Sequence, residues 1–425
     1  MTPLTSFVNA YCFHKMLIFH TSDWHLGNVF HRHDRIEEHQ HFFAWLLTQL
    51  RTYKPDAMIV SGDIFDNTNP SAAAERIYYE FLQQAVECVE GLQIVIIAGN
   101  HDSAHRLEAP SPFLKRNNIY VRGNIKNLDT QTPDFEHYLL PLSLRSNPEA
   151  KVVCMALPYL RACDYPASMS ITEGLKYYFD KMTRALNQSP FKKLPVVGAA
   201  HFYASGVDIA DEHSERLVVG GQDVVEMKHL ENHFAYMALG HIHRRQAVAK
   251  NSKKGGEIYY SGSVLPMSFS EKHYQHGIIM VNIDEEANVS VEPLDYQPMK
   301  KLISIPERGA ATTEEVLRAI AELPNRTASA DTAHWPYLEL RVMEQQPEPT
   351  FLNDVMQVLK DKAVHFCRIV RETPRITHIS DSAACNDSEK VDLRLKPEEL
   401  AKHVYKQKYE TEMPQEMLER LSRCM

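Results

Sequence analysis

Asp23 and His25 stand two residues apart, directly after an apolar run that begins at Met16 and reads MLIFHT. Large apolar residues in such a run predict a strand that is covered on both faces. Side chains two positions apart at a strand end point the same way, so this carboxylate and imidazole could bind one divalent cation. Taken alone, the triplet is more simply explained as a turn aspartate and a surface histidine.

Four further apolar runs end in the same kinds of side chain. They are, in chain order, DAMIVS before Asp63 and Asp66, QIVIIA before Asn100, His101 and Asp102, LPVVGAA before His201, and AYMAL before His241 and His243. Binding sites of α/β folds lie outside the carboxyl ends of the strands. Scattered surface residues do not explain five such strand ends in one chain, although His201 by itself could be a core or surface histidine.

The types of these side chains indicate the class of metal. No cysteine takes part, which disfavours a structural zinc site. Imidazole, carboxylate and amide oxygen together suit manganese, iron or zinc in a catalytic site. These candidate ligands are too many for one ion, and about seven of them would fit two ions that share a carboxylate. Two ions about 3.5–4 Å apart can bind an attacking water and a phosphoryl oxygen, which predicts phosphoester hydrolysis.

Composition limits the other possibilities. The chain has 425 residues, of which 44% are hydrophobic, so we expect two or three domains with substantial cores. No apolar stretch is long enough to span a membrane, and the first 15 residues lack the pattern of a signal peptide. The seven cysteines are scattered without a C-x-x-C pair, which predicts a cytoplasmic location. The net charge of −9 argues against binding nucleic acid by bulk charge but allows a local basic groove.

Elements that could position these residues alternate along the first half of the chain. A helix with Phe43, Leu46, Leu47 and Leu50 on one face precedes DAMIVS, and a helical stretch at 71–90 precedes QIVIIA. Further strand-like runs are VVCMAL at 152–157, EIYYSG at 257–262 and GIIMVNI at 277–283. This order predicts α/β layers with a sheet of mixed strands.

After residue 298 the pattern becomes β-α-β-α-β, with helices expected at 313–323 and 351–363. We therefore expect an extension at 1–15 that is poorly ordered, a main domain at 16–297, a small α+β domain at 298–371, a linker at 372–392 and a helical tail at 393–425. The tail would present the apolar residues Leu400, Val404, Leu418 and Leu421. They either dock on their own protein or bind a partner.

The motifs D-x-H, G-D-x-x-D, G-N-H-D, a lone histidine and G-H-x-H, in this order, resemble those of the calcineurin-like metallophosphoesterases. The longer stretches TSDWHLG, AGNHDS, LGHIHR and YSGSVLPMSF are similar to the bacterial double-strand-break repair nucleases of that superfamily. The resemblance is strong over residues 16–282 and architectural beyond them. It implies an α/β fold, a β-sandwich flanked by helices, followed by the capping domain and the helical tail.

The resemblance also implies a role for each candidate. One ion would be held by Asp23, His25, Asp63 and His243, and a second by Asp63, Asn100, His201 and His241, so that Asp63 bridges them. His101 would donate a proton to the leaving oxygen. The Asp66 carboxylate would accept a hydrogen bond from His101 and orient it, unless Asp66 only caps the next helix. Asp102 would support its turn, and Trp24 would serve packing.

The implied function is a Mn²⁺- or Mg²⁺-dependent DNA exonuclease and endonuclease of repair and recombination, assisted by the ATP of an SMC-like partner that receives the tail helices. No G-x-x-x-x-G-K-[ST] motif for ATP is present in this chain. A homodimer would form through helices at 71–90 and 108–117, with Tyr78, Tyr79 and Phe81 as candidate contacts. Basic side chains after the last ligands could contact DNA phosphates or belong to a solvated hairpin loop: Arg244, Arg245, Lys253 and Lys254.

Two other functions remain open at this point. Phosphatases and small-molecule phosphodiesterases share the same type of metal site, so the ligands alone do not name the substrate. The alternative in which the protein is not an enzyme is a scaffold that binds DNA ends. The complete ligand set argues against the scaffold, because lost ligands would be the first sign of an idle site.

Overall fold

The computed structural model describes residues 15–128, 132–207, 224–227, 230, 234–248, 256–326, 332–344 and 348–372, together with Lys402, Pro414 and Met417. The chain divides into two compact units, Met1–Thr373 and Pro374–Met425. The predicted extension falls almost wholly outside the described residues, and so do the linker and most of the tail. Within the described part of the chain, no helix has the length and apolar character that a membrane span requires.

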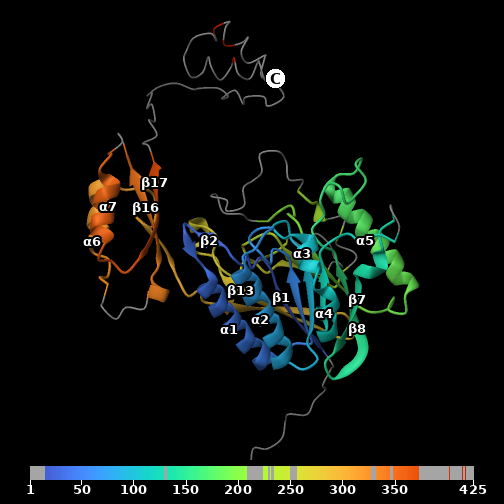
Figure 1. The fold of residues 1–425 in the computed structure, drawn as a ribbon. Coiled ribbons are helices and arrows are strands. Elements are labelled where there is room, and N and C mark those ends of the chain that lie inside the picture. The colour runs from blue at the N-terminus through green and yellow to red at the C-terminus, as the bar shows by residue number, and fades with distance from the viewer. Residues whose placement is uncertain are drawn as a thin grey trace, which may run out of the picture. The chain divides into compact units, whose positions relative to one another are not determined.

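Two six-stranded sheets form the body of the first unit (Figure 1). The first has the order β14-β13-β1-β4-β5-β6, and its central strands β1, β4, β5 and β6 run parallel. Its strands are β1 (Met16–Thr21), β4 (Ala57–Ser61), β5 (Gln93–Ile97), β6 (Ile119–Arg122), β13 (His276–Ile283) and β14 (Val289–Tyr296). The apolar runs that predicted strands here are buried throughout β4 and β5, as expected for strands covered on both faces.

The second sheet has the order β11-β12-β10-β9-β8-β7, in which β8, β9, β10 and β12 are parallel. Its strands are β7 (Leu139–Leu144), β8 (Asn147–Ala156), β9 (Val196–His201), β10 (Tyr236–Gly240), β11 (Gln246–Ala247) and β12 (Glu257–Tyr260). Residues of both sheets form one core, in which Ile59 and Val95 of the first meet Val197 and Ala238 of the second. The predicted β-sandwich is therefore confirmed.

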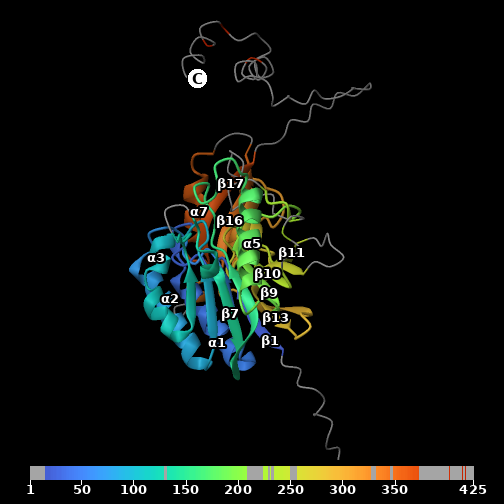
Figure 2. The ribbon, with the colours of Figure 1, turned by 90° about the vertical axis from the view of Figure 1, so that its right-hand side faces the viewer.

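Helices cover the outer faces of the sandwich. α1 (Ile36–Tyr53) and α2 (Ala72–Cys88) bury their apolar faces against the first sheet, and α5 (Ile171–Gln188) covers the second (Figure 2). The shorter helical segments are α3 (Ala104–Glu108), α4 (Ser111–Leu114), η1 (Lys115–Asn117), η2 (Phe135–Tyr138) and η4 (Phe269–Glu271). Helix α5 was not predicted, although its amphipathic pattern and its capping box of Ser170 and Glu173 are sequence signals for a helix.

Residues 302–372, the part of the first compact unit that we call the capping domain, form a parallel three-stranded sheet in the order β15-β16-β17 with two helices. Its elements are β15 (Leu302–Ile305), α6 (Thr313–Ala321), η5 (Thr332–His334), β16 (Tyr337–Met343), α7 (Phe351–Leu359) and β17 (His365–Glu372). This is the predicted β-α-β-α-β order, with the second helix four residues shorter than expected. A short hairpin of β2 (Val29–Phe30) and β3 (His33–Asp34) lies in the main domain, and its residues contact the capping domain.

Candidate metal centre

The candidate ligands lie where the carboxyl ends of the two sheets meet. Strands β1, β4 and β5 lead to Asp23, Asp63 and Asn100, and β9 and β10 of the other sheet lead to His201 and His241. The ring Nδ1–H of His201 donates to the Ser61 carbonyl at 2.8 Å, which joins the end of β9 to the end of β4. The layered fold thus brings together side chains that are far apart in the sequence.

Unusual backbone conformations turn these side chains toward one point. Asp23, His25 and Asp63 have φ angles of 51°, 48° and 50°, in the left-handed region that non-glycine residues rarely adopt. The strand-end loops hold one another in this form: the Asp23 N–H donates to the Gly62 carbonyl and the His25 N–H to the Asp63 carbonyl, both at 3.0 Å. Such local strain is a feature of functional sites when surrounding structure enforces it.

Asp23, His25 and His243 form the first group of ligands, and all three are buried. The Nε2 atoms of His25 and His243 lie 3.2 Å apart. Two imidazole nitrogens face each other stably when a proton or a cation lies between them. The Asp23 carboxylate accepts the His241 N–H at 2.9 Å and the Ser22 hydroxyl, which leaves it oriented beside these rings.

The second group comprises Asp63, His201 and His241, joined by the side chain of Asn100. The Asn100 Oδ1 lies 2.9 Å from His201 Nε2 and 3.0 Å from His241 Nδ1. Asp63 Oδ2 lies 3.3 Å from His201 Nε2 and 3.8 Å from His25 Nε2 of the first group. Asp63 therefore stands between the two groups, and this nitrogen-rich and oxygen-rich donor set fits two divalent cations.

The charges at the centre are strongly coupled. Burial by itself would raise the pKa of Asp63, but the neighbouring His201, with His25 and His101, holds that pKa well below its usual range. Burial likewise opposes the charge on His201, yet Asp63 outweighs it and raises the His201 pKa. Burial, with the charge of His201, lowers the pKa of His241 to about 3. At a pH below the raised pKa of His201, a cation that binds His201 would displace a proton from it.

His101 is exposed at the edge of this centre. Its backbone N–H donates to Asp63 Oδ1 at 2.9 Å, and its ring Nδ1–H donates to the backbone carbonyl of Asp66 at 2.8 Å. This contact uses Nδ1, so Nε2 is the ring nitrogen that can exchange a proton with a bound substrate.

The predicted hydrogen bond from His101 to the Asp66 carboxylate is wrong. That carboxylate instead accepts from Asn28 Nδ2 at 3.0 Å and lies 3.5 Å from His25 Nδ1. Because the loop presents the main chain of Asp66 to His101, the carbonyl oxygen orients the ring and the side chain is free to face His25. Asp66 thus belongs to the site, with its carboxylate facing a different histidine.

Asp102 and Trp24 have the structural roles that we expected. The Asp102 carboxylate is fully buried and accepts three backbone N–H groups, from Gly99 at 2.8 Å, Phe65 at 2.9 Å and Ile64 at 3.2 Å. It therefore ties the β4 loop to the β5 loop. Burial, reinforced by Asp63, raises the Asp102 pKa to about 6. Trp24 is fully buried, and its Nε1–H donates to Thr21 Oγ1 at 2.9 Å.

Sequence reasoning missed Glu271. Its Oε1 lies 3.2 Å from His243 Nδ1, and only 2% of the residue is exposed. Glu271 does not follow a strand, so the strand-end pattern could not indicate it. It is the last residue of the short helix η4, which comes after the stretch VLPMSF begins. A carboxylate directly after a buried apolar stretch is the one signal that could have indicated it.

Of the four basic residues predicted to contact DNA, the structure describes two, and both contact other side chains of the protein. The Arg245 guanidinium forms an ion pair with Asp295, and Arg244 lies 5.9 Å from the centre of the Tyr274 ring. Lys253 and Lys254 lie outside the described residues, as do the four apolar tail residues Leu400, Val404, Leu418 and Leu421. Their predicted roles remain predictions.

Two family models match the chain. The calcineurin-like phosphoesterase model matches residues 16–245, and a model described as the type 5 capsule protein repressor C-terminal domain matches residues 298–409. The phosphoesterase match spans the strands and loops that carry all seven candidate ligands. The fold of this family implies divalent metal ions, in agreement with the donor set described above.

Curated relatives match over most of the chain. A Rhodobacter capsulatus protein, named as the D subunit of the nuclease SbcCD, is 32% identical over 78% of this chain and 81% of its own length. Proteins of the same name from Bacillus subtilis and Escherichia coli K12 are each 30% identical, over 80% and 70% of their own lengths. The chain is thus similar to these nuclease subunits over both the phosphoesterase and the following region.

Proposed function

The chain belongs to the calcineurin-like phosphoesterase family, and from this premise we propose that it acts as the nuclease subunit of an SbcCD complex. It is a metal-dependent phosphodiesterase that hydrolyses DNA. The observation that carries the proposal is the pair of ligand groups joined by Asp63, in a chain 32% identical to a named nuclease subunit. The ions are proposed to be Mn²⁺, with Mg²⁺ as the alternative.

The chemistry follows from the donor atoms. Two divalent ions at such a centre supply an activated water and neutralise charge on the phosphoryl group. Asp23, His25, Asp63 and His243 would hold one ion, and Asp63, Asn100, His201 and His241 the other. Asp63 keeps the two groups in a fixed relation, because its backbone and side chain are both tied to neighbouring loops.

His101 is the proposed proton donor to the leaving oxygen. The hydrogen bond from Nδ1 to the Asp66 carbonyl fixes the ring plane and leaves Nε2 to carry the transferred proton. The proposal is supported by the exposure of His101, because a phosphodiester can approach an exposed ring beside six buried candidate ligands. The Asp66 carboxylate supports His25, which is its nearest ionisable neighbour in the described contacts.

The substrates and partner extend this proposal. We propose ATP-assisted exonuclease activity on double-stranded DNA and endonuclease activity on single strands and hairpins, with SbcC supplying the ATP site. Two copies of each subunit would form a heterotetramer in the cytoplasm. Of the predicted dimer contacts, Tyr78 and Phe81 are core residues, whereas Tyr79 in α2 is 38% exposed. In the second predicted dimer segment, 108–117, Phe113 of α4 is 75% exposed. Tyr79 and Phe113 are therefore the residues that a homodimer would cover.

The deciding experiment compares two substrates. The purified chain, alone and with SbcC, is incubated with a hairpin-ended duplex or with a small aryl phosphomonoester, in Mn²⁺, Mg²⁺ or EDTA. Manganese-dependent cutting of the duplex that EDTA abolishes is the expected result. Rapid hydrolysis of the monoester with the DNA intact, even with SbcC present, would instead assign the chain to the phosphatases of this fold. Metal binding without either activity would favour the scaffold.

A further inference from the structure

Glu271 connects the metal centre to the short helix η4. One carboxylate oxygen, Oε1, faces His243 Nδ1 at 3.2 Å, and the other, Oε2, accepts the Met267 N–H at 2.8 Å. Both side chains of the Glu271–His243 pair are at least nine-tenths buried. When His243 Nδ1–H donates to this carboxylate, the ring's Nε2 is left as an acceptor that points toward His25 Nε2.

This geometry is that of a carboxylate behind a metal-binding histidine. Such a carboxylate fixes the tautomer and plane of the ring and increases the basicity of the ligating nitrogen. Among the ring nitrogens that point away from the centre, His201 Nδ1 meets a backbone carbonyl, whereas His243 Nδ1 meets a charged side chain. The position of the His243 ring therefore depends on the position of the Glu271 carboxylate.

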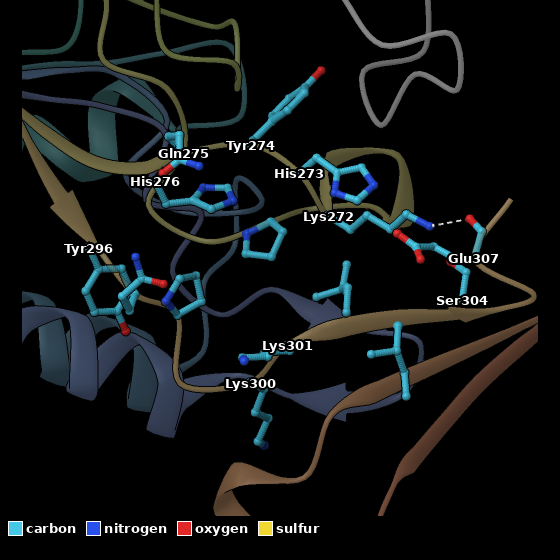
Figure 3. Close-up of a pocket in the computed structure, with 15 residues that line it drawn as sticks. Lys272, His273, Tyr274, Gln275, His276, Tyr296, Lys300, Lys301, Ser304 and Glu307 are labelled. Carbon is cyan, nitrogen blue, oxygen red and sulfur yellow. Dashed lines mark hydrogen bonds between the residues drawn. The ribbon is translucent and has the colours of Figure 1, made fainter. Parts of the chain in front are cut away.

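The capping domain contacts the helix that carries Glu271. The Phe269 ring, two residues earlier and 2% exposed, lies 5.4 Å from the Phe30 ring and 5.5 Å from the guanidinium carbon of Arg368 in β17. Arg368 is itself held by Glu339 of β16, with Nε 2.6 Å from Oε2. One turn further along, the Lys272 Nζ donates to the Glu307 carbonyl at 3.0 Å (Figure 3).

A second set of contacts reaches the same loop through α1. The Tyr337 hydroxyl of the capping domain donates to Glu38 Oε1 at 2.7 Å, and Glu38 forms a buried ion pair with Arg35 at 2.9 Å. Arg35 Nη1 then donates to the Pro266 carbonyl at 2.6 Å, at the start of the loop that leads into η4. The segment around Glu271 is thus held by two chains of contacts from the capping domain, which meet at the Phe30 and Tyr337 rings.

We propose that Glu271 is a positioning residue for His243 and that the capping domain, acting through η4, holds Glu271 in place. The inference rests on the proposed function only in treating His243 as a ligand of a divalent cation. If this inference is correct, the affinity of the Asp23–His25–His243 group for that cation depends on the position of the capping domain. Nucleic acid or a partner protein that shifts the capping domain would then alter cation binding at a distance.

The first test measures cation binding without DNA. Calorimetric titration of Mn²⁺ into the full metal-free chain is compared with the Glu271→Gln variant, which keeps the side-chain volume and removes the charge. We expect one of the two binding events to weaken by about 10- to 100-fold and the other to stay unchanged. Affinities for both events equal to those of the wild type would overturn the positioning role.

The second test separates the capping domain's contribution from general loosening. Arg368→Ala removes the contact with Phe269, and Arg371→Ala is the matched control, because Arg371 is on the same strand and pairs with Glu344 at 2.9 Å. We expect Arg368→Ala to weaken the same binding event by about 2- to 30-fold and Arg371→Ala to leave it unchanged. Adding Arg368→Ala to Glu271→Gln should cause little further loss.

Two results would overturn the coupling. One is an unchanged Mn²⁺ affinity in Arg368→Ala, and the other is an equal loss in Arg371→Ala, which would indicate non-specific destabilisation. Circular dichroism melts of each variant identify any that has lost its fold. Because cation binding is read without substrate, failure here is distinguishable from failure of the nuclease proposal, in which both cations bind and DNA remains uncut.

Discussion

Histidines gather in two regions of this molecule, the metal centre and a cluster between the main and capping domains. The second, which we call the interface cluster, consists of His31, His33 and His365 with Phe30 and Tyr337. The rings of His33 and His365 lie 5.0 Å apart, and that of Tyr337 lies 5.4 Å from the first and 5.6 Å from the second. Residue type alone therefore does not identify the site that can hold a cation.

The difference lies in what the ring nitrogens face. At the metal centre, some ring nitrogens face another ring nitrogen or a carboxylate, as in the 3.2 Å approach of His25 to His243 and the 3.3 Å approach of His201 to Asp63. In the interface cluster, His33 Nε2 meets the Phe366 carbonyl at 3.2 Å and His365 Nε2 meets the Thr332 carbonyl at 3.0 Å. Backbone carbonyls satisfy single N–H donors, so that cluster serves packing between domains.

Replacing Asp63 should have the largest effect on the metal centre and none on the interface cluster. Asp63→Asn removes the charge that joins the two ligand groups, so we expect a loss of at least about 1000-fold in DNA cleavage, equivalent to several kcal/mol of lost transition-state stabilisation. Bound manganese, measured by elemental analysis, should fall with it. Asp34→Asn beside the interface cluster is the control and should retain both. Full metal content with full activity in Asp63→Asn would refute the two-cation centre.

His101 provides the next largest effect. His101→Gln should lower kcat for DNA cleavage by about 100- to 10,000-fold while both cations still bind, because a proton donor is lost and no ligand is removed. His33→Gln in the interface cluster should change kcat by less than about threefold. A variant of His101 that also loses a cation would make this residue a ligand and contradict its assignment.

The sequence indicates which side chains lie together at the candidate metal centre because the relevant signal is local. Each ligand follows a buried apolar run, and the parallel order of β1, β4 and β5 brings their ends to one edge. Local patterns also predicted the β-α-β-α-β order of residues 302–372, whereas the sandwich was predicted from the family resemblance. Strand ends report the position of a ligand without any knowledge of distant contacts.

The remainder depends on contacts that no local pattern records. Glu271 becomes relevant only once η4 is folded against both His243 and the capping domain. The error at Asp66 has a similar cause, since sequence cannot tell whether a loop presents its carbonyl or its carboxylate. The interface cluster was not predicted either, because His33 and His365 are 332 positions apart and neither follows a buried run into the centre.

Replacing the Asp66 carboxylate should lower kcat less than replacing His101. Because the carbonyl of this residue orients His101, Asp66→Asn should preserve that hydrogen bond and lower kcat by less than about tenfold, with the charge near His25 as the principal loss. Steady-state cleavage of the hairpin duplex measures this directly. A loss as large as that of His101→Gln would restore the carboxylate as the orienting group.

The smallest expected effect is a change in how the stability of the metal-free protein depends on pH. Burial, followed by the charges of Lys300 and His33, lowers the pKa of His365 despite its Thr332 hydrogen bond and the charge of Glu38. A histidine with a lowered folded-state pKa contributes stability that is lost as pH falls below about 6.5. In EDTA, urea unfolding should therefore show that His365→Gln is less sensitive to acid than the wild type.

His201 at the metal centre should respond in the opposite direction. Asp63 raises the pKa of His201 against the effect of burial, so the protonated ring stabilises the metal-free fold fully below about pH 6.5 and loses that contribution as pH rises through the folded-state pKa. His201→Gln should consequently flatten the alkaline side of the stability profile, while His365→Gln flattens the acid side. If both variants changed the same side, the two histidine regions would not differ electrostatically in the way that their contacts require.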